Sequence, residues 1–311
     1  MMYLSIFYMT MNKKVKKLVT HSGSFQSDDI FAAAAIALML EQSGEQYEII
    51  RTRDPEIIKT GDYVFDVGGI HDESINRFDH HQIGGAGQGL DNVEYAAFGL
   101  VWKKFGKVVA GGEEAAEIIN KRLATPIDAW DNGMDLVENK YNVSPYYIQH
   151  FFIAMVPTWR EENLTNDEMF LKSVEIAKII LTREITHARD ALIAEEKVID
   201  AYQNSKDKKI IILDKQYPHE YTLNKFPEPL FVIYPRPDGT WGARAVRKDP
   251  KTFDNRKDFP KAWAGLREEE MEKISGVAGA IFCHRGLFLA VAKSREGAIK
   301  LAQLALLEPK S

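Results

Sequence analysis

Short apolar runs alternate with helical stretches along the first part of the chain. The runs at 17–20, 47–52 and 62–67 have the length and composition of buried strands. Between the first two, a helix is predicted from Phe31 to Glu41, capped by Ser27-Asp28-Asp29, with acids in the first turn where the helix dipole favours them. This rhythm of strand, helix and strand predicts a parallel sheet covered by helices.

Helical periodicity dominates the next part of the chain. Apolar positions recur every three to four residues at 93–105, 113–122, 144–155 and 167–202. The last of these stretches is long and rich in charge, which is typical of a helix that joins two domains. The composition then turns polar at 204–209, and we place the domain boundary there.

A second set of strands follows that boundary. Strands are predicted at 210–213, 230–234, 241–246, 280–284 and 287–291, and a closing helix at 295–307. We therefore predict an α/β protein with two domains. An N-terminal parallel-sheet domain with helices on both faces covers 12–203 and includes the connecting helix, and a smaller C-terminal α/β domain covers 204–311. Met11 is an alternative start of the chain.

Composition narrows the class of protein without naming a function. The 311 residues include 40 Lys+Arg and 45 Asp+Glu, for a net charge of −5, and 45% are hydrophobic, which excludes a disordered or fibrous chain. The apolar run Ile30–Leu40 is too short to span a bilayer, so no membrane association is expected. Because Cys283 is the sole cysteine, no internal disulfide can form, and we expect a cytoplasmic protein.

Four separated clusters of carboxylates and imidazoles fall where strands and turns are predicted. They are His21 with Asp28, Asp66 alone, Asp79-His80-His81, and Asp128 with Asp131. Ligands bind beyond the carboxyl ends of strands in open parallel sheets, so these segments could converge in one crevice. Such a set can hold two divalent metals roughly 3.5–4 Å apart, the arrangement used for phosphoester hydrolysis. Mixed imidazole and carboxylate ligands favour Mn²⁺, Zn²⁺ or iron over Mg²⁺.

Each cluster also has a plainer interpretation. Asp28 could cap a helix, and Asp66 could simply end a strand in a turn. Asp128 and Asp131 lie one helical turn apart and could be a helix-start acid pair. Two adjacent histidines after an acid, His80-His81, have no obvious structural use, although a solvated surface pair is an alternative. Only the combination of clusters favours a metal site.

The second half carries a local excess of positive charge. Nine basic residues outnumber four acids between 231 and 267, and aromatic residues are interleaved with them. Cations for phosphates and rings for bases are typical of a single-strand site, whereas the alternative is a solvated charged face over an aromatic core. The candidate substrate contacts are Arg244, Arg247, Arg267, the glycines Gly276 and Gly279, which allow close approach of the backbone to a phosphate, and His284.

These motifs together resemble a known family. The matching stretches are THSGSF at 20–25, FDVGG at 65–69, RFDHHQ at 77–82, IDAWDNG at 127–133, KAWAGLR at 261–267 and SGVAGAIFCH at 275–284. The chain resembles the melanocyte-proliferating-gene (Myg) family of DHH-like metal-dependent hydrolases and exonucleases, within the DHH phosphoesterase superfamily. The resemblance extends from about residue 18 to the end.

The resemblance implies a metal-dependent phosphodiesterase. It implies a 3′→5′ exonuclease on single-stranded RNA, with DNA as an alternative substrate. A homodimer is a possible oligomeric state. By motif position, the metal ligands would be His21, Asp28, Asp66 and His80, completed by Asp128 or Asp131. The metal would be a pair of Mn²⁺ ions, with Mg²⁺ or Zn²⁺ as alternatives.

The same resemblance assigns catalytic roles around the double histidine. His80 and His81 would act in catalysis, with His81 supporting the ligands or contacting the scissile phosphate, and Asp79 would orient both rings. The chain departs from the family pattern at Gln26, where a histidine is usual. Two alternatives stay open. One is a hydrolase of small phosphoesters or pyrophosphate, in which the basic and aromatic second half would cap a compact substrate; the other is a nucleic-acid-binding protein whose catalysis is impaired by Gln26.

Overall fold

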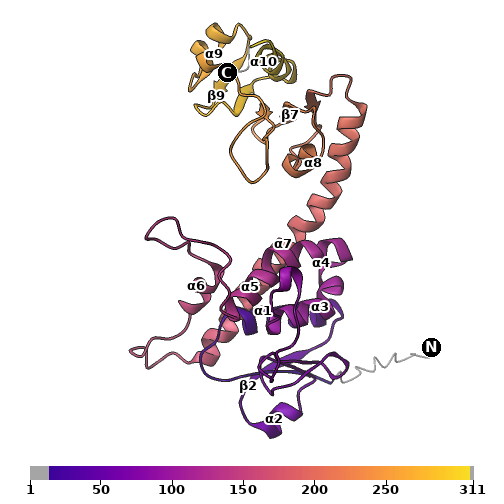
Figure 1. Ribbon diagram of the computed structural model, residues 1–311, viewed down its shortest axis with the longest axis vertical. Coiled ribbons are helices and arrows are strands. Elements are labelled where there is room, and N and C mark those ends of the chain that lie inside the picture. The colour runs from indigo at the N-terminus through magenta and orange to yellow at the C-terminus, as the bar shows by residue number, and fades with distance from the viewer. Residues whose placement is uncertain (1–13, 309–311) are drawn as a thin grey trace, which may run out of the picture. The chain divides into compact units, whose positions relative to one another are not determined.

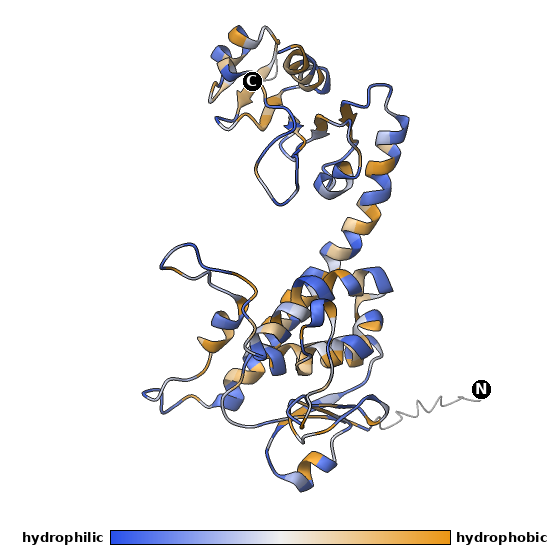
Figure 2. Cartoon of the chain, in the orientation of Figure 1, coloured by the Kyte–Doolittle hydropathy of each residue, from blue (hydrophilic) through white to orange (hydrophobic). Residues whose placement is uncertain are grey.

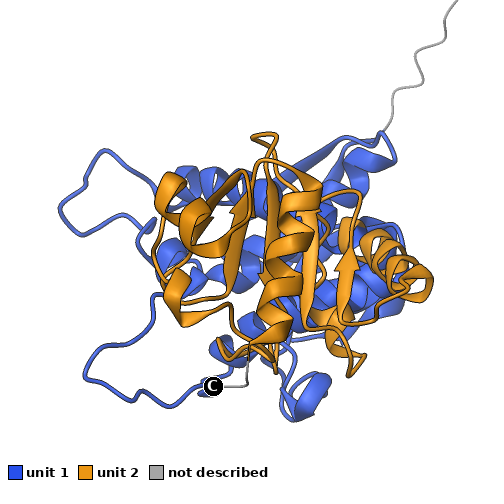
Figure 3. Cartoon of the chain, turned by 90° about the horizontal axis from the view of Figure 1, so that it is seen from above, with its two compact units in different colours: residues 1–189 blue, residues 190–311 orange. Residues whose placement is uncertain are grey.

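The computed structural model describes residues 14–308, which form two compact units (Figures 1 and 3). One unit ends at Arg189 and the other begins at Asp190, so the division falls inside the helix α7 (Asn166–Asn204). The alternative start at Met11 and the two outermost ends of the predicted domains, at residues 12–13 and 309–311, lie outside the described residues.

The first unit is built on a sheet with the strand order β2-β1-β3-β5-β4. The strand β1 (Lys16–Thr20) pairs in parallel with β2 (Tyr47–Arg51) and β3 (Tyr63–Phe65), and β3 pairs in parallel with β5 (Arg77–Phe78). This confirms the predicted parallel sheet. The edge strand β4 (His71–Asp72) is antiparallel to β5. Neither of these two-residue strands was predicted, because two residues are too short for a detectable periodicity.

Helices cover both faces of this sheet, as predicted. On one face, α1 (Ser27–Gln42) packs against α3 (Ala97–Ala110), and the alanines at 32–35 are fully buried, which lets the helices approach closely. On the other face, the short helix α2 (Pro55–Lys59) contributes Ile58 to an apolar cluster with the strand residues Val19 and Val64. The central strands β1 and β3 are thereby largely buried on both sides.

The remaining helices of the first unit differ from the predicted bounds. The helix predicted at 93–105 begins at Ala97 and runs to Ala110, where Gly111 adopts a left-handed conformation with φ of 72°. The stretch predicted at 113–122 contains α4 (Glu113–Ile119) and the start of a π-helical turn (Asn120–Ala124). The helix α5 (Thr125–Asp131) follows it and was not predicted. The helix predicted at 144–155 shortens to α6 (Ile148–Ile153).

The second unit contains a sheet with the strand order β6-β7-β8-β10-β9. Its strands are β6 (Ile210–Ile212), β7 (Phe231–Pro235), β8 (Trp241–Ala245), β9 (Ala280–Cys283) and β10 (Leu289–Ala292). The β6–β7 pair is parallel, and the other neighbouring strands of this sheet pair antiparallel. This sheet confirms the predicted second α/β region.

Alternating side chains divide the second sheet into two apolar faces. Phe231 and Ile233 point into a core with α9 (Glu268–Ser275) and α10 (Arg295–Leu307). Val232 points into a core on the opposite face with α8 (Glu220–Asn224) and Val198 of α7. Successive turns of α7 alternate between hydrophobic and hydrophilic colours in Figure 2, as expected of a helix that is only partly covered. Within the part of the chain described, no helix is both long and apolar enough to cross a bilayer.

Candidate metal centre

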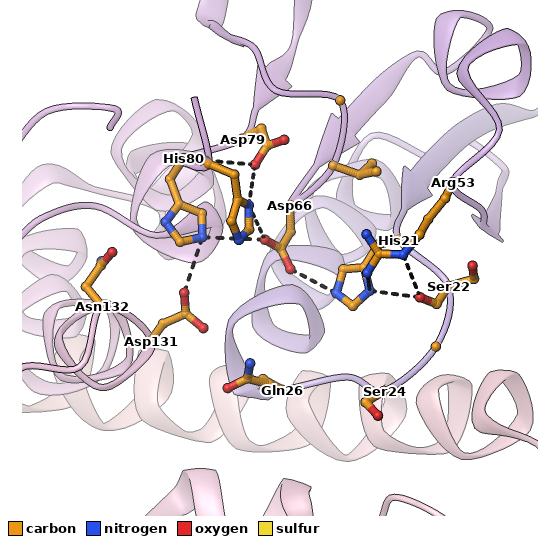
Figure 4. Close-up of a pocket in the computed structure, with 14 residues that line it drawn as sticks. His21, Ser22, Ser24, Gln26, Arg53, Asp66, Asp79, His80, Asp131 and Asn132 are labelled. Atoms are coloured by element: carbon orange, nitrogen blue, oxygen red, sulfur yellow. Dashed lines mark hydrogen bonds and ion pairs between the residues drawn. The ribbon is translucent and has the colours of Figure 1, made fainter. Parts of the chain in front are cut away.

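A pocket of about 990 Å³ lies at the carboxyl edge of the first sheet (Figure 4). His21 follows β1, Asp66 follows β3, and Asp79, His80 and His81 follow β5. Parallel strands end at the same edge of a sheet, and for this reason three segments far apart in the sequence meet here. Asp131, the last residue of α5, faces them across the pocket.

Asp66 lies at the centre of the pocket, between two groups of imidazoles. Its Oδ2 is 3.1 Å from His21 Nε2, and its Oδ1 is 3.5 Å from both His80 Nε2 and His81 Nδ1. Asp66 adopts a left-handed backbone conformation with φ of 51°, which aspartate tolerates better than most residues. This turn directs the two oxygens of one carboxylate toward different histidines.

Asp79 orients its neighbour His81. The Asp79 carboxylate is buried; its Oδ2 accepts a hydrogen bond from the Gly69 N–H, and its Oδ1 accepts one from the His81 N–H at 3.2 Å. The same Oδ1 lies 2.8 Å from His81 Nδ1. The His81 ring is 62% exposed in the pocket, so Asp79 holds an accessible imidazole in a fixed orientation.

Asp29 is a member of this cluster that the sequence did not reveal. Its Oδ1 accepts a hydrogen bond from the Gln26 N–H at 2.9 Å, and its Oδ2 lies 3.3 Å from His21 Nε2. An acid three residues after a helix cap is usual in a capping box, so the sequence around Asp29 predicts a helix start and not a metal ligand. Only the fold shows that Asp29, His21 and Asp66 present ligand atoms within 4.8 Å of one another.

Asp28 and Asp128 cap the helix α3. Asp28 accepts hydrogen bonds from the N–H groups of Ala97 (3.2 Å) and Phe98 (2.8 Å), and Asp128 accepts one from Gly99 at 2.9 Å. Both carboxylates are almost fully buried. They satisfy first-turn donors of α3 that have no partner within that helix.

This arrangement corrects the expected cap of the first helix. The N-cap of α1 is Gln26, and its backbone bonds to Asp29, whereas Asp28 points away to the neighbouring helix α3. Asp28 nevertheless presents an oxygen within 4.8 Å of ligand atoms of His80 and Asp131. Asp128 joins none of the three candidate metal groups found among the described residues.

Electrostatics in the pocket show a surplus of negative charge. Burial and the neighbouring carboxylates raise the pKa of Asp28 well above its usual range and that of Asp131 to about 6. Burial opposes protonation of His21, but the adjacent carboxylates of Asp29 and Asp66 outweigh it and raise its pKa to about 10. The carboxylates therefore attract any positive charge within reach.

Unpartnered atoms indicate which kind of cation fits. Asp29 Oδ2 and His80 Nε2 are buried without a hydrogen-bond partner among the described residues. His80 Nε2 lies 3.2 Å from Asp131 Oδ2, so this imidazole and carboxylate face the same point. Imidazole nitrogens and carboxylate oxygens in one crevice are a donor set that suits divalent transition metals.

Two arginines at the end of β2 lie near the pocket, and one of them, Arg53, lines it. Arg53 is exposed; its Nε donates to the Ser22 carbonyl at 3.3 Å, and its Nη2 lies 3.2 Å from His21 Nδ1. Arg51 is buried; it donates to the Gly23 carbonyl at 2.7 Å and lies 4.6 Å from the Phe170 ring of α7. Arg51 thus fixes the loop that carries His21, and Arg53 adds a cation to the pocket. No sequence motif marked either arginine.

The residues predicted to bind substrate lie in the second unit, most of them beside aromatic rings. Arg244 lies 5.3 Å from the Phe288 ring, which also packs against His284 at 4.3 Å, and Arg267 lies 4.7 Å from the Phe282 ring. We call these five residues the aromatic strip.

The other three predicted contacts serve the local structure. Arg247 lies 5.0 Å from the Phe253 ring and donates to the Pro250 carbonyl. Gly276 ends α9 in a left-handed conformation, and Gly279 also has a positive φ, of 76°.

Fold and site together define a class of protein: a two-sheet α/β protein with an acid- and imidazole-lined pocket at the carboxyl edge of its parallel sheet. The sequence model of the MYG1 exonuclease family, described as uncharacterised protein family UPF0160, matches residues 17–306. The chain belongs to this family.

Curated relatives span nearly the whole chain. The MYG1 exonuclease of Bos taurus is 27% identical and covers 93% of this chain and 84% of its own. The MYG1 protein of Chlamydia muridarum is 30% identical, with 92% and 95% covered. A RecJ structure with Mn²⁺ from Thermus thermophilus is 11% identical over 95% of this chain and 53% of its own. Its TM-score of 0.28 is too low to support an argument about this chain.

Proposed function

We propose that this protein is a metal-dependent exonuclease that shortens single-stranded nucleic acid from one end. The observation that carries the proposal is the position of Asp66, whose two oxygens face His21 on one side and His80 with His81 on the other. A carboxylate shared in this way is what two neighbouring divalent ions need to offset their mutual repulsion. Membership of the MYG1 exonuclease family supports the same reaction class.

The pocket offers ligands for two ions. We infer that His21, Asp29 and Asp66 hold one, and that Asp28, His80 and Asp131 hold the other, with Asp66 Oδ1 3.5 Å from His80 Nε2. Asp131 is preferred to Asp128 because Asp128 is engaged with α3. Bound divalent ions supply Lewis-acid activation of water and of the phosphoryl group. Mn²⁺ fits the mixed donor set best, with Mg²⁺ or Zn²⁺ as alternatives.

Gln26 does not rule out an active site. It lines the pocket at the first turn of α1, where the resemblance led us to expect an imidazole. Asp29, three residues later, directs a buried oxygen, 3.3 Å from His21 Nε2, into the same side of the pocket. This extra carboxylate can replace the missing ligand, which favours an enzyme over a protein with impaired catalysis.

The residues around the ions would orient the substrate. Asp79 holds the exposed His81 ring against the pocket, where it can contact a non-bridging oxygen of the scissile phosphate or protonate the leaving oxygen. Arg53 at the mouth adds a fixed positive charge for the same phosphate. Neither role needs a serine nucleophile or a triad.

The aromatic strip of the second unit supports a single-stranded substrate. Rings flanked by arginines and a histidine can stack unpaired bases while the cations contact phosphates. The preference for RNA and the 3′→5′ direction rest on the family resemblance. The homodimer and the cytoplasmic location likewise stay predictions.

Purified protein incubated with Mn²⁺ and end-labelled RNA tests the proposal. A 5′-labelled strand should shorten one nucleotide at a time, whereas a 3′-labelled strand should release its label first. A DNA strand of the same sequence measures the preference for RNA, and Asp66→Asn serves as the inactive control. Cleavage restricted to pyrophosphate or small esters, or binding without products, would overturn the proposal.

A further inference from the structure

A second cavity, of about 460 Å³, adjoins the metal pocket on the side of α2. Arg53, Val67 and Gly68 line both cavities, so the two lie side by side. Its volume lies within the roughly 300–1,000 Å³ of small-molecule sites. We call it the α2 groove.

The α2 groove has the opposite charge to the metal pocket. Every ionisable side chain among its lining residues is a cation: Arg53, Lys59 and Arg77. Arg77 Nη2 donates to the Lys59 carbonyl at 3.5 Å, which brings these two residues together within the groove, while Arg53 lies at the junction with the metal pocket. A polyanion that enters the metal pocket therefore finds further positive charge next to it.

The rest of the groove is an apolar wall. Ile58, Val64 and Val67 belong to the apolar cluster beneath α2, and Ile70 is 53% exposed at the side. An apolar wall beside a few cations suits a ligand with a flat or apolar part and a phosphate. A nucleotide has both, whereas an inorganic anion would not use the wall.

We propose that the α2 groove binds the nucleotide next to the scissile phosphate, with its phosphate on Arg53 and Lys59 and its base and sugar against Ile58 and Ile70. This inference rests on the proposed exonuclease function and adds a subsite to it. It explains why Arg53 lies at the junction: adjacent phosphates of one strand would fall on either side of it.

Lys59→Met removes one groove cation and has a matched control in Lys107→Met. Lys59 pairs with Glu56 at 2.6 Å and Lys107 with Glu113 at 3.0 Å, and both lysines are about two-thirds exposed. With a labelled RNA pentamer, Lys59→Met should raise KM by about threefold at unchanged kcat, as for one exposed charge contact. The dependence of log KM on log salt should weaken by about 0.7, the value for one lost phosphate contact on a single strand. Lys107→Met should change neither quantity.

Hydrolysis of bis(p-nitrophenyl) phosphate isolates the groove from the metal pocket. This diester carries no neighbouring phosphate, so Lys59→Met should leave its rate unchanged. Ile70→Asp places an anion on the exposed wall and should raise KM for the pentamer by about tenfold, because it repels phosphate as well as removing apolar contact. Wild-type KM in both variants, or equal losses on both substrates, would overturn the groove proposal.

Binding without turnover separates this proposal from the exonuclease function. In EDTA, fluorescence anisotropy of the same pentamer should show weaker binding to Ile70→Asp than to the wild type. Equal binding, or none by the wild type, would again overturn the groove. Wild-type protein that binds the pentamer but leaves it intact with Mn²⁺ contradicts the exonuclease function and leaves the groove supported by its binding data.

Discussion

The two units of this protein differ in how far their polar and charged side chains are paired. At the edge of the first sheet, Asp29 Oδ2 and His80 Nε2 are buried without hydrogen-bond partners. Burial and the neighbouring carboxylates also oppose ionisation of Asp28 and raise its pKa. In the second unit, Arg244 and Arg247 share the carboxylate of Glu220 at 2.9 and 3.4 Å. Buried polar atoms without hydrogen-bond partners in a pocket are candidates for binding a cation, whereas ion-paired groups stabilise the fold without any ligand.

Replacing Asp66 should have the largest effect. Asp66→Asn keeps the shape of the residue but removes the charge shared by both histidine groups, so kcat/KM should fall at least about 10³-fold, equivalent to roughly 4 kcal/mol. Metal content by mass spectrometry should fall with it, while the circular dichroism spectrum stays unchanged. The exposed Asp91, replaced in Asp91→Asn, is the control. Full activity of Asp66→Asn would remove the basis of the two-ion site.

Metal binding should stabilise only the first unit, and more strongly at higher pH. At an Mn²⁺ concentration of 100 times Kd, the added stability is about 2.7 kcal/mol, or roughly 5–10 °C in the melting transition of that unit. Folding raises the pKa of Asp131 to about 6, so the folded protein binds this proton more tightly than the unfolded chain does. The metal-free protein therefore loses this contribution to its free energy of unfolding as the pH rises through 6. Mn²⁺ takes the place of that proton.

Calorimetry at pH 5 and pH 8 measures this effect. The shift caused by Mn²⁺ should be larger at pH 8, since His21, with a pKa of about 10, must also lose its proton to bind a metal. Asp131→Asn should reduce the difference between the two pH values. An equal shift at both, or a shift in the transition of the second unit, would contradict the site.

The capping of α3 should contribute about 1–3 kcal/mol to the stability of the first unit. A Cβ at Gly99 would lie 1.7 Å from Asp128 Oδ2, so Gly99→Ala must displace the buried carboxylate that caps this helix. Gly112→Ala is the matched control, because its Cβ meets no atom within 4 Å. Urea unfolding compares the two variants, and equal midpoints would show that the Asp128 cap is dispensable.

The sequence predicted the sheet edge and most of the side chains that meet there for a simple reason. Strands such as 17–20 and 62–67 are recognisable as short apolar runs, and the polar residues that follow them must meet at one edge when the strands are parallel. His21 and Asp66 are brought together in this way. Their position depends on the parallel order of the strands, and the alternation of apolar runs and helical stretches predicts that order.

The sequence could not assign consecutive acids to partners. Asp28 and Asp29 are neighbours, but one residue turns a helix by about 100°, so Asp28 faces α3 and Asp29 faces His21. Asp128 and Asp131 diverge similarly: the first bonds to Gly99, and the second reaches the pocket from the last residue of α5. Which helix packs on which face decides the role of each acid, and no local pattern records it.

The smallest effect is expected in the aromatic strip. Arg244→Met keeps the side-chain length beside the Phe288 ring but removes the charge, so KM for a long RNA strand should rise by about threefold at unchanged kcat. Arg236→Met, which removes an arginine that is paired with Asp238 in the turn after β7, is the control. Loss of Arg244 also leaves Glu220 paired with Arg247 alone, so the second unit should lose a few tenths of a kcal/mol in urea unfolding. A change in stability with no change in KM would mean that Arg244 serves only the fold. The proposal that the second unit binds substrate would then rest on Arg267 and His284.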